Sequence, residues 1–251
     1  MLDVSGLSKS FGAIQALDRV DLRVEKGSIH GIIGPNGSGK TTLFNCVTGM
    51  LKPDSGSIRL EGEAITGQKP EIIANKGIRR TFQAGKLIPS LTVIENVMSG
   101  VNDPIGSAAR DAALRPPFVP SARESEIEAR ALRILSLVGL EASARRWAAD
   151  LVWTERQLVQ IARALIAAPK LLLLDEPASG MGAKEMEKVE DIIRNIREMG
   201  VTVVVVSHDV KMLMNLSDGV TVLNFGKRIA EGVPEQIQKD PRVLEAYLGT
   251  E

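Results

Sequence analysis

The stretch GPNGSGKT, residues 34–41, constrains this chain more than any other feature. It directly follows the apolar run GSIHGII (27–33), which predicts a central buried strand, and it precedes a predicted helix. A glycine, four residues and then Gly-Lys-Thr, placed between a strand and a helix, is typical of a loop whose backbone amides surround phosphate groups. The sequence therefore predicts a phosphate-binding loop here.

The residue types of this loop suit a phosphate ligand. Gly34, Gly37 and Gly39 let the backbone approach the phosphates without a Cβ clash, and the next helix directs its N-terminus at the anion. Lys40 is expected to neutralise the β- and γ-phosphates of a nucleotide, and the hydroxyl of Thr41 to hold Mg²⁺. The alternative is an Asn-Gly turn with a solvated lysine. The predicted nucleotide contacts in the loop are Gly34, Pro35, Asn36, Gly37, Ser38, Gly39, Lys40, Thr41 and Thr42.

Two acidic residues end a second apolar run, KLLLLDEP (170–177). The carboxyl ends of parallel strands are where α/β sheets bind ligands. Asp175 is therefore a candidate Mg²⁺ ligand, directly or through water, and Glu176 is a candidate base for an attacking water. Without the phosphate loop, the pair would read equally well as solvated carboxylates at a strand end.

The two histidines receive different interpretations. His208 closes the strand predicted at 201–207, where it can hydrogen-bond a γ-phosphate and the attacking water. His30 lies inside the strand that precedes the phosphate loop, with no motif around it, and is interpreted as a core residue. Gln83 follows RRTF at a change in composition, where a glutamine can bridge Mg²⁺, water and a second lobe.

Alternating or continuous apolar residues predict strands at 2–8, 16–25, 27–33 and 56–65, and later a strand–helix–strand unit followed by a hairpin at 219–232. Between them lies a proline-rich stretch and then a helix that opens with a capping box at Ser121 and Glu124 and ends near Gly139. The order of elements indicates an α/β fold with a parallel sheet, interrupted by a helical region.

Composition excludes several classes of protein. The 31 basic and 31 acidic residues give a net charge of zero, which disfavours a nucleic-acid partner. Cys46 is the only cysteine, so the chain cannot build a disulfide framework, and a reducing compartment is expected. The N-terminus lacks the apolar core of a signal peptide, and no stretch approaches the ~20 apolar residues of a membrane span. Any membrane involvement would depend on a partner.

The set of GPNGSGKT, Gln83, LLLLDEP and His208, in that order, resembles the ATP-binding subunit of ABC transporters over nearly the whole chain. The resemblance implies an α/β P-loop NTPase core with a mostly parallel sheet, an N-terminal antiparallel β-subdomain and an inserted helical subdomain. The core would comprise 1–85 and 166–235, the helical subdomain 86–165 and a C-terminal tail 236–251.

The same resemblance implies an ATPase that uses Mg²⁺, with Glu176, His208 and Gln83 in catalysis and Thr41, Gln83 and Asp175 at the metal. Phe11, before GAIQAL, matches the aromatic residue that stacks on adenine in this family; the alternative is a core phenylalanine. Two such subunits would dimerise head to tail around two ATP molecules and associate with two transmembrane permease subunits.

The C-terminal segment, ending in DPRVLEAYLG, is similar to the ATPases of branched-chain amino acid importers. This similarity implies a peripheral subunit on the cytoplasmic face of the inner membrane, served indirectly by an external solute-binding protein. Leu87, Ile88 and Leu91 are candidates for docking a membrane subunit, or alternatively for packing inside the helical lobe.

One stretch departs from the family. Where the signature reads Leu-Ser-Gly-Gly-Gln, or Leu-Ser-Tyr-Gly-Gln in this subfamily, this chain has Leu-Val-Trp-Thr-Glu at 151–155. Val152 lacks the hydroxyl, Thr154 adds bulk, and Glu155 places negative charge where a helix N-terminus should bind a phosphate. Thr154 and Gln157 predict a capping box that begins the helix at Thr154. These changes predict unequal ATP sites in a heterodimer with a second ATP-binding subunit.

Two further hypotheses remain open at the sequence level. The altered signature is also compatible with an ATP-gated regulatory or structural subunit that hydrolyses weakly, although Glu176 and His208 are retained. A DNA-repair or translation ATPase of the same superfamily would be expected to carry a long coiled coil, a second tandem copy or a basic excess.

Overall fold

A computed structural model of the chain describes residues 1–81, 87–101 and 122–248. The chain divides into two units, one formed by Met1–Gln83 with Lys170–Glu251 and the other by Ala84–Pro169. The first unit carries the phosphate loop and both β-sheets, and the second carries the altered signature helix.

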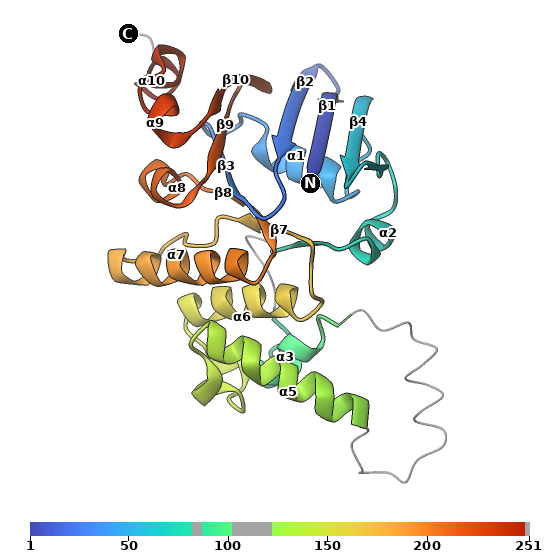
Figure 1. Cartoon of the computed structure of the whole chain (residues 1–251), viewed down its shortest axis with the longest axis vertical. Helices are drawn as coiled ribbons and strands as arrows, with labels where there is room; N and C mark the ends of the chain where they lie inside the picture. The colour runs from blue at the N-terminus through green and yellow to red at the C-terminus, as the bar shows by residue number, and fades with distance from the viewer. Residues whose placement is uncertain (82–86, 102–121, 249–251) are drawn as a thin grey trace. The chain divides into compact units, whose positions relative to one another are not determined.

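The larger sheet of the first unit is parallel except at one edge (Figure 1). Its inner strands β3, β7 and β8 are buried along their whole length, as expected of continuous apolar runs. The hairpin predicted at 219–232 is confirmed, and its turn residues Phe225 and Gly226 both have positive φ, as a type I′ turn requires. In sheet order the strands are β10 (Lys227–Gly232), β9 (Gly219–Asn224), β3 (Ile29–Ile33), β8 (Thr202–Val206), β7 (Leu171–Asp175) and β6 (Ile78–Arg80).

The smaller sheet is antiparallel and comes from the N-terminal part of the chain. The single strand predicted at 56–65 is wrong in one respect: Glu61 and Gly62 both have positive φ and turn the chain back on itself, which gives two strands. The fold class predicted from the sequence is confirmed. In sheet order the strands are β2 (Ile14–Val24), β1 (Leu2–Phe11), β4 (Ser55–Leu60) and β5 (Glu63–Ala64).

Helix α1 packs with both sheets in one apolar core. The core joins side chains of both sheets to Leu43, Phe44 and Val47 of α1, the helix that follows the phosphate loop. Burying apolar side chains from two sheets and a helix in one cluster fixes α1 against the strands that carry the acidic residues. The helices of this unit are α1 (Lys40–Val47), α2 (Pro70–Asn75), α7 (Ala183–Glu198), α8 (Val210–Leu216), α9 (Pro234–Ile237) and α10 (Pro241–Leu248).

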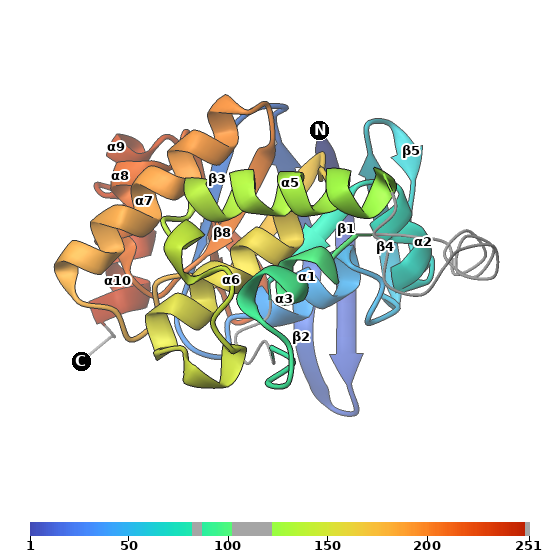
Figure 2. The same cartoon turned by 90° about the horizontal axis from the view of Figure 1, so that it is seen from below.

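The second unit is helical, and α3, α5 and α6 pack against one another (Figure 2). Ser121, the predicted cap of α5, lies outside the described residues, and Gly139 follows the helix with a positive φ, as predicted for its end. The elements are α3 (Val93–Met98), α5 (Ala122–Leu137), the short 3₁₀ turns η1 (Glu141–Ser143) and η2 (Ala148–Asp150), and α6 (Trp153–Leu165).

Two glycines of the N-terminal sheet provide a matched test of close backbone packing. A Cβ on Gly56 would lie 2.5 Å from the Gly6 carbonyl oxygen and 2.6 Å from the Leu7 Cα, whereas a Cβ on Gly62 would meet nothing within 4 Å. Both have positive φ, so alanine strains the backbone at either position. We predict that Gly56→Ala lowers the free energy of unfolding by about 1–3 kcal/mol more than Gly62→Ala, because only the former overpacks the sheet. Urea unfolding of both variants measures the difference, and equal losses would contradict this packing.

Candidate functional site

The loop between β3 and α1 wraps around the side chain of Lys40. The Lys40 Nζ donates to the carbonyl oxygens of Gly34 at 2.7 Å and Pro35 at 2.9 Å. A Cβ on Gly34 would overlap the Leu223 carbonyl, and one on Gly39 would lie 2.6 Å from the Ala16 carbonyl, so neither position accepts a side chain without movement. The loop conformation therefore depends on these two glycines, as the sequence motif indicates.

A cavity of about 230 Å³ joins the phosphate loop to the acidic residues. Asp175 and Glu176 line it together with the predicted phosphate-loop contacts from Asn36 to Thr42, but without Gly34 and Pro35, although the acidic residues are more than 130 positions away in the chain. Burial lowers the pKa of Lys40, while the negative charges of Glu176 and Asp175 raise it. The residues lining the cavity are Ala16, Asn36, Gly37, Ser38, Gly39, Lys40, Thr41, Thr42, Asp175, Glu176 and Val206.

Glu176 is held in a strained conformation beside His208. Its φ of 53° lies in the left-handed region, which a non-glycine residue rarely adopts, and its backbone N–H donates to the Val206 carbonyl at 2.9 Å. The Glu176 Oε2 lies 2.6 Å from His208 Nδ1 and also accepts the His208 backbone N–H at 3.3 Å. Such strain persists at functional sites when the surroundings impose it, and here it pairs a buried carboxylate with an exposed imidazole.

Asp175 forms a buried ion pair that the sequence motifs did not indicate. Its Oδ2 accepts from Arg80 Nη2 at 2.7 Å, and both side chains are at most 6% exposed. Arg80 Nη1 also donates to Asn45 Oδ1 at 2.6 Å, and its guanidinium lies 5.2 Å from the Phe44 ring centroid. The only sequence signal for this residue was its place in the RRTF stretch before Gln83, and a short basic pair is normally solvated.

The remaining predicted residues are placed differently. Phe11 lies at the end of β1, is 47% exposed, and is not among the residues that line the phosphate-loop cavity; Lys9 Nζ lies 5.8 Å from its ring centroid. Gln83 falls outside the described residues. The core interpretation of His30 agrees with the structure, where His30 is buried and its Nε2 lies 2.9 Å from Thr221 Oγ1.

The altered signature forms the start of α6, but not as predicted. The helix begins at Trp153 with Val152 as its N-cap, so the capping box at Thr154 and Gln157 is wrong. Glu155 caps the helix instead: its Oε2 accepts the Val152 N–H at 3.1 Å, and its Oε1 accepts from Arg146 Nη1 at 2.9 Å. Glu155, in the third helical position, places a carboxylate within reach of the Val152 amide. Gln157 lies two residues further along the helix, and its side chain is buried.

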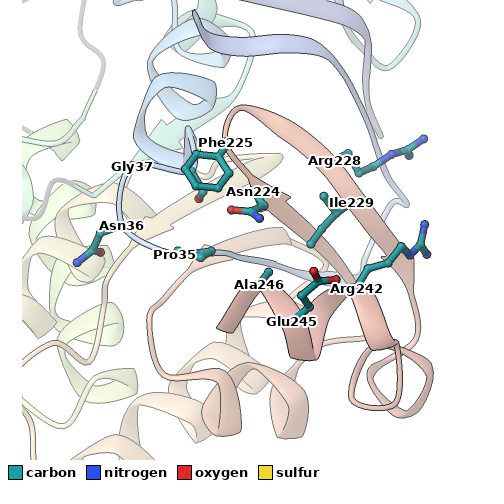
Figure 3. A pocket seen from close by; sticks show the side chains of 11 residues that line it. Pro35, Asn36, Gly37, Asn224, Phe225, Arg228, Ile229, Arg242, Glu245 and Ala246 are labelled. Carbon is teal, nitrogen blue, oxygen red and sulfur yellow. The ribbon is translucent and has the colours of Figure 1, made fainter. Parts of the chain in front are cut away.

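A second cavity, of about 800 Å³, lies between the phosphate loop, the β9–β10 turn and α10 (Figure 3). Phe225 from the turn and Arg242, Glu245 and Ala246 from α10 contribute to its lining. Burial raises the pKa of Tyr247 on the same helix, and a hydrogen bond with the Gly34 backbone opposes that effect. The C-terminal helix α10 therefore packs beside the phosphate loop. The sequence had indicated only a C-terminal tail at 236–251.

Comparison with known proteins identifies the family of this chain. The ABC transporter family model matches residues 17–179, which span the phosphate loop, the altered signature and both acidic residues. The chain belongs to the ABC transporter ATP-binding cassettes. As a cassette of this family it is an ATP-binding transport ATPase, and the resemblance seen in the sequence is confirmed.

A second family model, branched-chain amino acid ATP-binding cassette transporter, matches residues 227–251 of the cassette, which include α10. The cassette is 40% identical to the high-affinity branched-chain amino acid transport ATP-binding protein BraF of Pseudomonas aeruginosa, covering 99% of this chain and 98% of BraF. It is 38% identical to LivG of Escherichia coli K12, which carries the same description, over 99% and 98% of the two chains.

Solved structures give the same assignment. The ADP conformation of MJ1267, an ATP-binding cassette of an ABC transporter, matches with a TM-score of 0.86 and 33% identity, over 100% of this cassette and 99% of that chain. The dimeric structure of MJ0796, a bacterial ABC transporter cassette, matches with a TM-score of 0.77 and 28% identity, over 93% and 99%.

His30 provides a pH test of the core beneath the site. Burial lowers its pKa from 6.5 to about 4, so the folded cassette keeps His30 neutral while the unfolded chain binds a proton below pH 6.5. Stability conferred by the neutral form is therefore present above pH 6.5 and is lost as pH falls toward 4. Since one pKa unit corresponds to ~1.4 kcal/mol, we predict that the wild type loses about 3 kcal/mol more than His30→Gln between pH 7 and pH 4.

Glutamine is the matched replacement because its amide can still bond the Thr221 hydroxyl but does not titrate in this range. Chemical unfolding of both proteins across the pH series measures the difference. Parallel stability curves for the two proteins would show that His30 is not kept neutral by the fold.

Proposed function

We propose that this cassette hydrolyses ATP to drive import of branched-chain amino acids or a related solute. The observation that carries the proposal is the single cavity in which Lys40 and the phosphate loop lie with Asp175 and Glu176. The family match supports the ATPase, and the names of BraF and LivG, together with the C-terminal family match, support the solute class.

The assembly that we propose has three kinds of partner. Two transmembrane permease subunits carry the solute path, a second ATP-binding subunit completes the ATPase, and an external solute-binding protein delivers the solute. Among residues 1–81, 87–101 and 122–248, no helix has the length and apolarity needed to cross a bilayer. We place the cassette as a peripheral subunit at the cytoplasmic face of the inner membrane, and no nucleic acid takes part.

The donor set fits Mg²⁺. The Asp175 carboxylate and the Thr41 hydroxyl line the same cavity, and oxygen ligands of this kind are those that Mg²⁺ prefers. We propose that these two residues, with Gln83, hold the ion, which when bound would neutralise charge on the β- and γ-phosphates. Lys40 and the backbone of residues 34–42 hold the phosphates, and Phe11 stacks on adenine.

Glu176 is the proposed base. Its carboxylate lines the phosphate cavity and is oriented by two hydrogen bonds from His208, so it can accept a proton from the water that attacks the γ-phosphorus. The bond between that water and phosphorus forms as the bond to the β-phosphate oxygen breaks, and ADP leaves with phosphate. His208 orients Glu176, and Gln83 would contact the water and the metal.

The second ATP site of the dimer is proposed to be impaired. In the family arrangement each site joins one subunit's phosphate loop to the other subunit's signature helix. At the start of α6 the amide of the N-cap residue Val152 is already used by Glu155, whose charge is offset by Arg146. A γ-phosphate arriving there would meet the Glu155 carboxylate and would lose the Val152 amide as a donor, and losing one preorganised donor typically costs ~10²–10³ in rate.

The surface next to α6 suits a protein partner. Val152 and Trp153 are 60% and 50% exposed, and large apolar side chains grouped on a surface favour burial against another chain. Of the candidate permease contacts, Leu87 is buried, which favours the packing alternative. Ile88 is exposed and Leu91 is partly exposed, so these two remain the proposed docking residues.

The experiment compares the two ATP sites in the reconstituted transporter. We predict that Glu176→Gln in this cassette lowers ATP hydrolysis by at least about 100-fold, because it removes the base of the intact site. The equivalent substitution in the partner cassette should have a small effect, because that site uses the altered α6. Steady-state ATPase rates of both complexes measure the contrast, with ATP binding to each variant as the control.

Equal losses from the two substitutions would contradict the asymmetry. A second candidate function, an ATP-gated regulatory subunit with weak hydrolysis, is favoured by the Glu155 cap on α6. It predicts that the wild-type complex hydrolyses ATP slowly and that Glu176→Gln leaves this low rate unchanged.

A further inference from the structure

The Arg80 side chain connects three elements of the ATP site. Arg80 lies on β6, and its Nη2 donates a hydrogen bond of 2.7 Å to Asp175 Oδ2 at the end of β7. Its Nη1 donates a hydrogen bond of 2.6 Å to Asn45 Oδ1 on α1. Phe44, the residue before Asn45, lies under the guanidinium with its ring centroid at 5.2 Å. Residues of α1 therefore fix the guanidinium of Arg80, which in turn fixes the carboxylate of Asp175.

We propose that Arg80 is a positioning residue for Asp175, which it holds by Oδ2 so that the other carboxylate oxygen is presented to Mg²⁺. This inference rests on the proposed function, because it assumes that Asp175 serves the nucleotide-bound metal. It assigns a role to a residue that belongs to neither the phosphate loop nor the acidic pair.

The geometry favours arginine over any other residue for this task. A guanidinium is planar and offers several N–H donors in fixed directions, so it can bond Asp175 and Asn45 at once while stacking on Phe44. Lysine would supply the charge as a single point and would lose the fixed directions. Groups that orient metal ligands in this way typically change metal affinity by about 10–100-fold when they are removed.

The competing interpretation is that Arg80 only compensates a buried charge. Removing one partner of a buried ion pair is destabilising because the other charge is left uncompensated. In that case Arg80→Met would damage the whole site, and nucleotide binding without metal would fall together with metal binding. The two interpretations therefore differ in which ligand is lost.

The chain contains a matched control in the neighbouring residue of the same strand. Arg79 is also partly buried, but its Nη1 donates to the backbone carbonyls of Ala74 at 2.6 Å and Ile78 at 3.1 Å rather than to a site residue. Arg79→Met removes the same kind of side chain from β6 and leaves Asp175 paired. Arg80→Lys keeps the charge and serves as the conservative variant if Arg80→Met does not fold.

The experiment uses the full-length cassette, wild type and the three variants, saturated with a non-hydrolysable ATP analogue. Mn²⁺ affinity is measured by electron paramagnetic resonance of the free ion, and analogue affinity is measured separately in EDTA. We expect Arg80→Met to weaken Mn²⁺ binding by about 10–100-fold, with Arg80→Lys intermediate and Arg79→Met unchanged. Analogue affinity in EDTA should stay at the wild-type level, because Lys40 and the phosphate loop are intact.

The proposal is overturned if Arg80→Met, or Arg80→Lys where only that variant folds, binds Mn²⁺ like the wild type. It is also overturned if analogue affinity in EDTA falls by the same factor as Mn²⁺ affinity, since that pattern means a structural role only. Failure of the proposed function is distinct: in that case the wild type itself would bind no Mn²⁺ together with the analogue.

Discussion

Three buried parallel strands hold the charges of the proposed ATP site together at their carboxyl ends. β3 pairs with β8 and β8 with β7 in register, so that Asp175 lies opposite Val206 and the phosphate loop leaves β3 at the same edge. Each strand is a largely apolar run that is buried on both faces, so the charged groups of the site lie at the strand ends. Residues far apart in the chain thereby share one cavity, and the left-handed backbone at Glu176 brings its carboxylate to His208.

The phosphate loop and the start of α6 differ in what they offer to an anion. At the phosphate loop, glycines keep side chains away and leave amides available to an anion, while Lys40 Nζ donates to the backbone oxygens of Gly34 and Pro35 and to the Ser38 hydroxyl. At the start of α6, the chain supplies its own anion, Glu155, and its own counter-ion, Arg146. The loop offers its amides to an anion, whereas the start of α6 already holds a carboxylate of its own, and this difference underlies the proposed inequality of the two ATP sites.

Much of this could be predicted from the sequence because the signals are local. Continuous apolar runs predicted β3, β7 and β8, and the Gly-Lys-Thr spacing predicted the loop around Lys40. The split of 56–65 was missed because Glu61 adopts a left-handed conformation that propensity does not favour outside a type I′ turn. The predicted cap at Thr154 rested on a local Thr-x-x-Gln pattern alone. The actual cap, Glu155, is paired with Arg146, and this pairing depends on the path of the 3₁₀ turn η2 between the two residues.

Arg80 could not have been identified from its sequence neighbours. Its partners, Asn45 and Asp175, lie 35 positions before it and 95 after it, and only the packing of β6, β7 and α1 brings them together. The cavity beside α10 is hidden in the same way, since it requires the C-terminal helix to pack beside the phosphate loop. Both features arise from tertiary contacts, for which a single sequence carries no periodic signal.

The central claim is that the α6 end of this cassette cannot complete an ATP site. The most direct measurement is the mass in solution, by light scattering, of the Glu176→Gln cassette with ATP and Mg²⁺, alone and mixed with a cassette that has an intact signature. The account predicts a monomer when the cassette is alone, because both sites of a homodimer would use the capped α6, and an ATP-dependent heterodimer in the mixture. A stable ATP-dependent homodimer would contradict it.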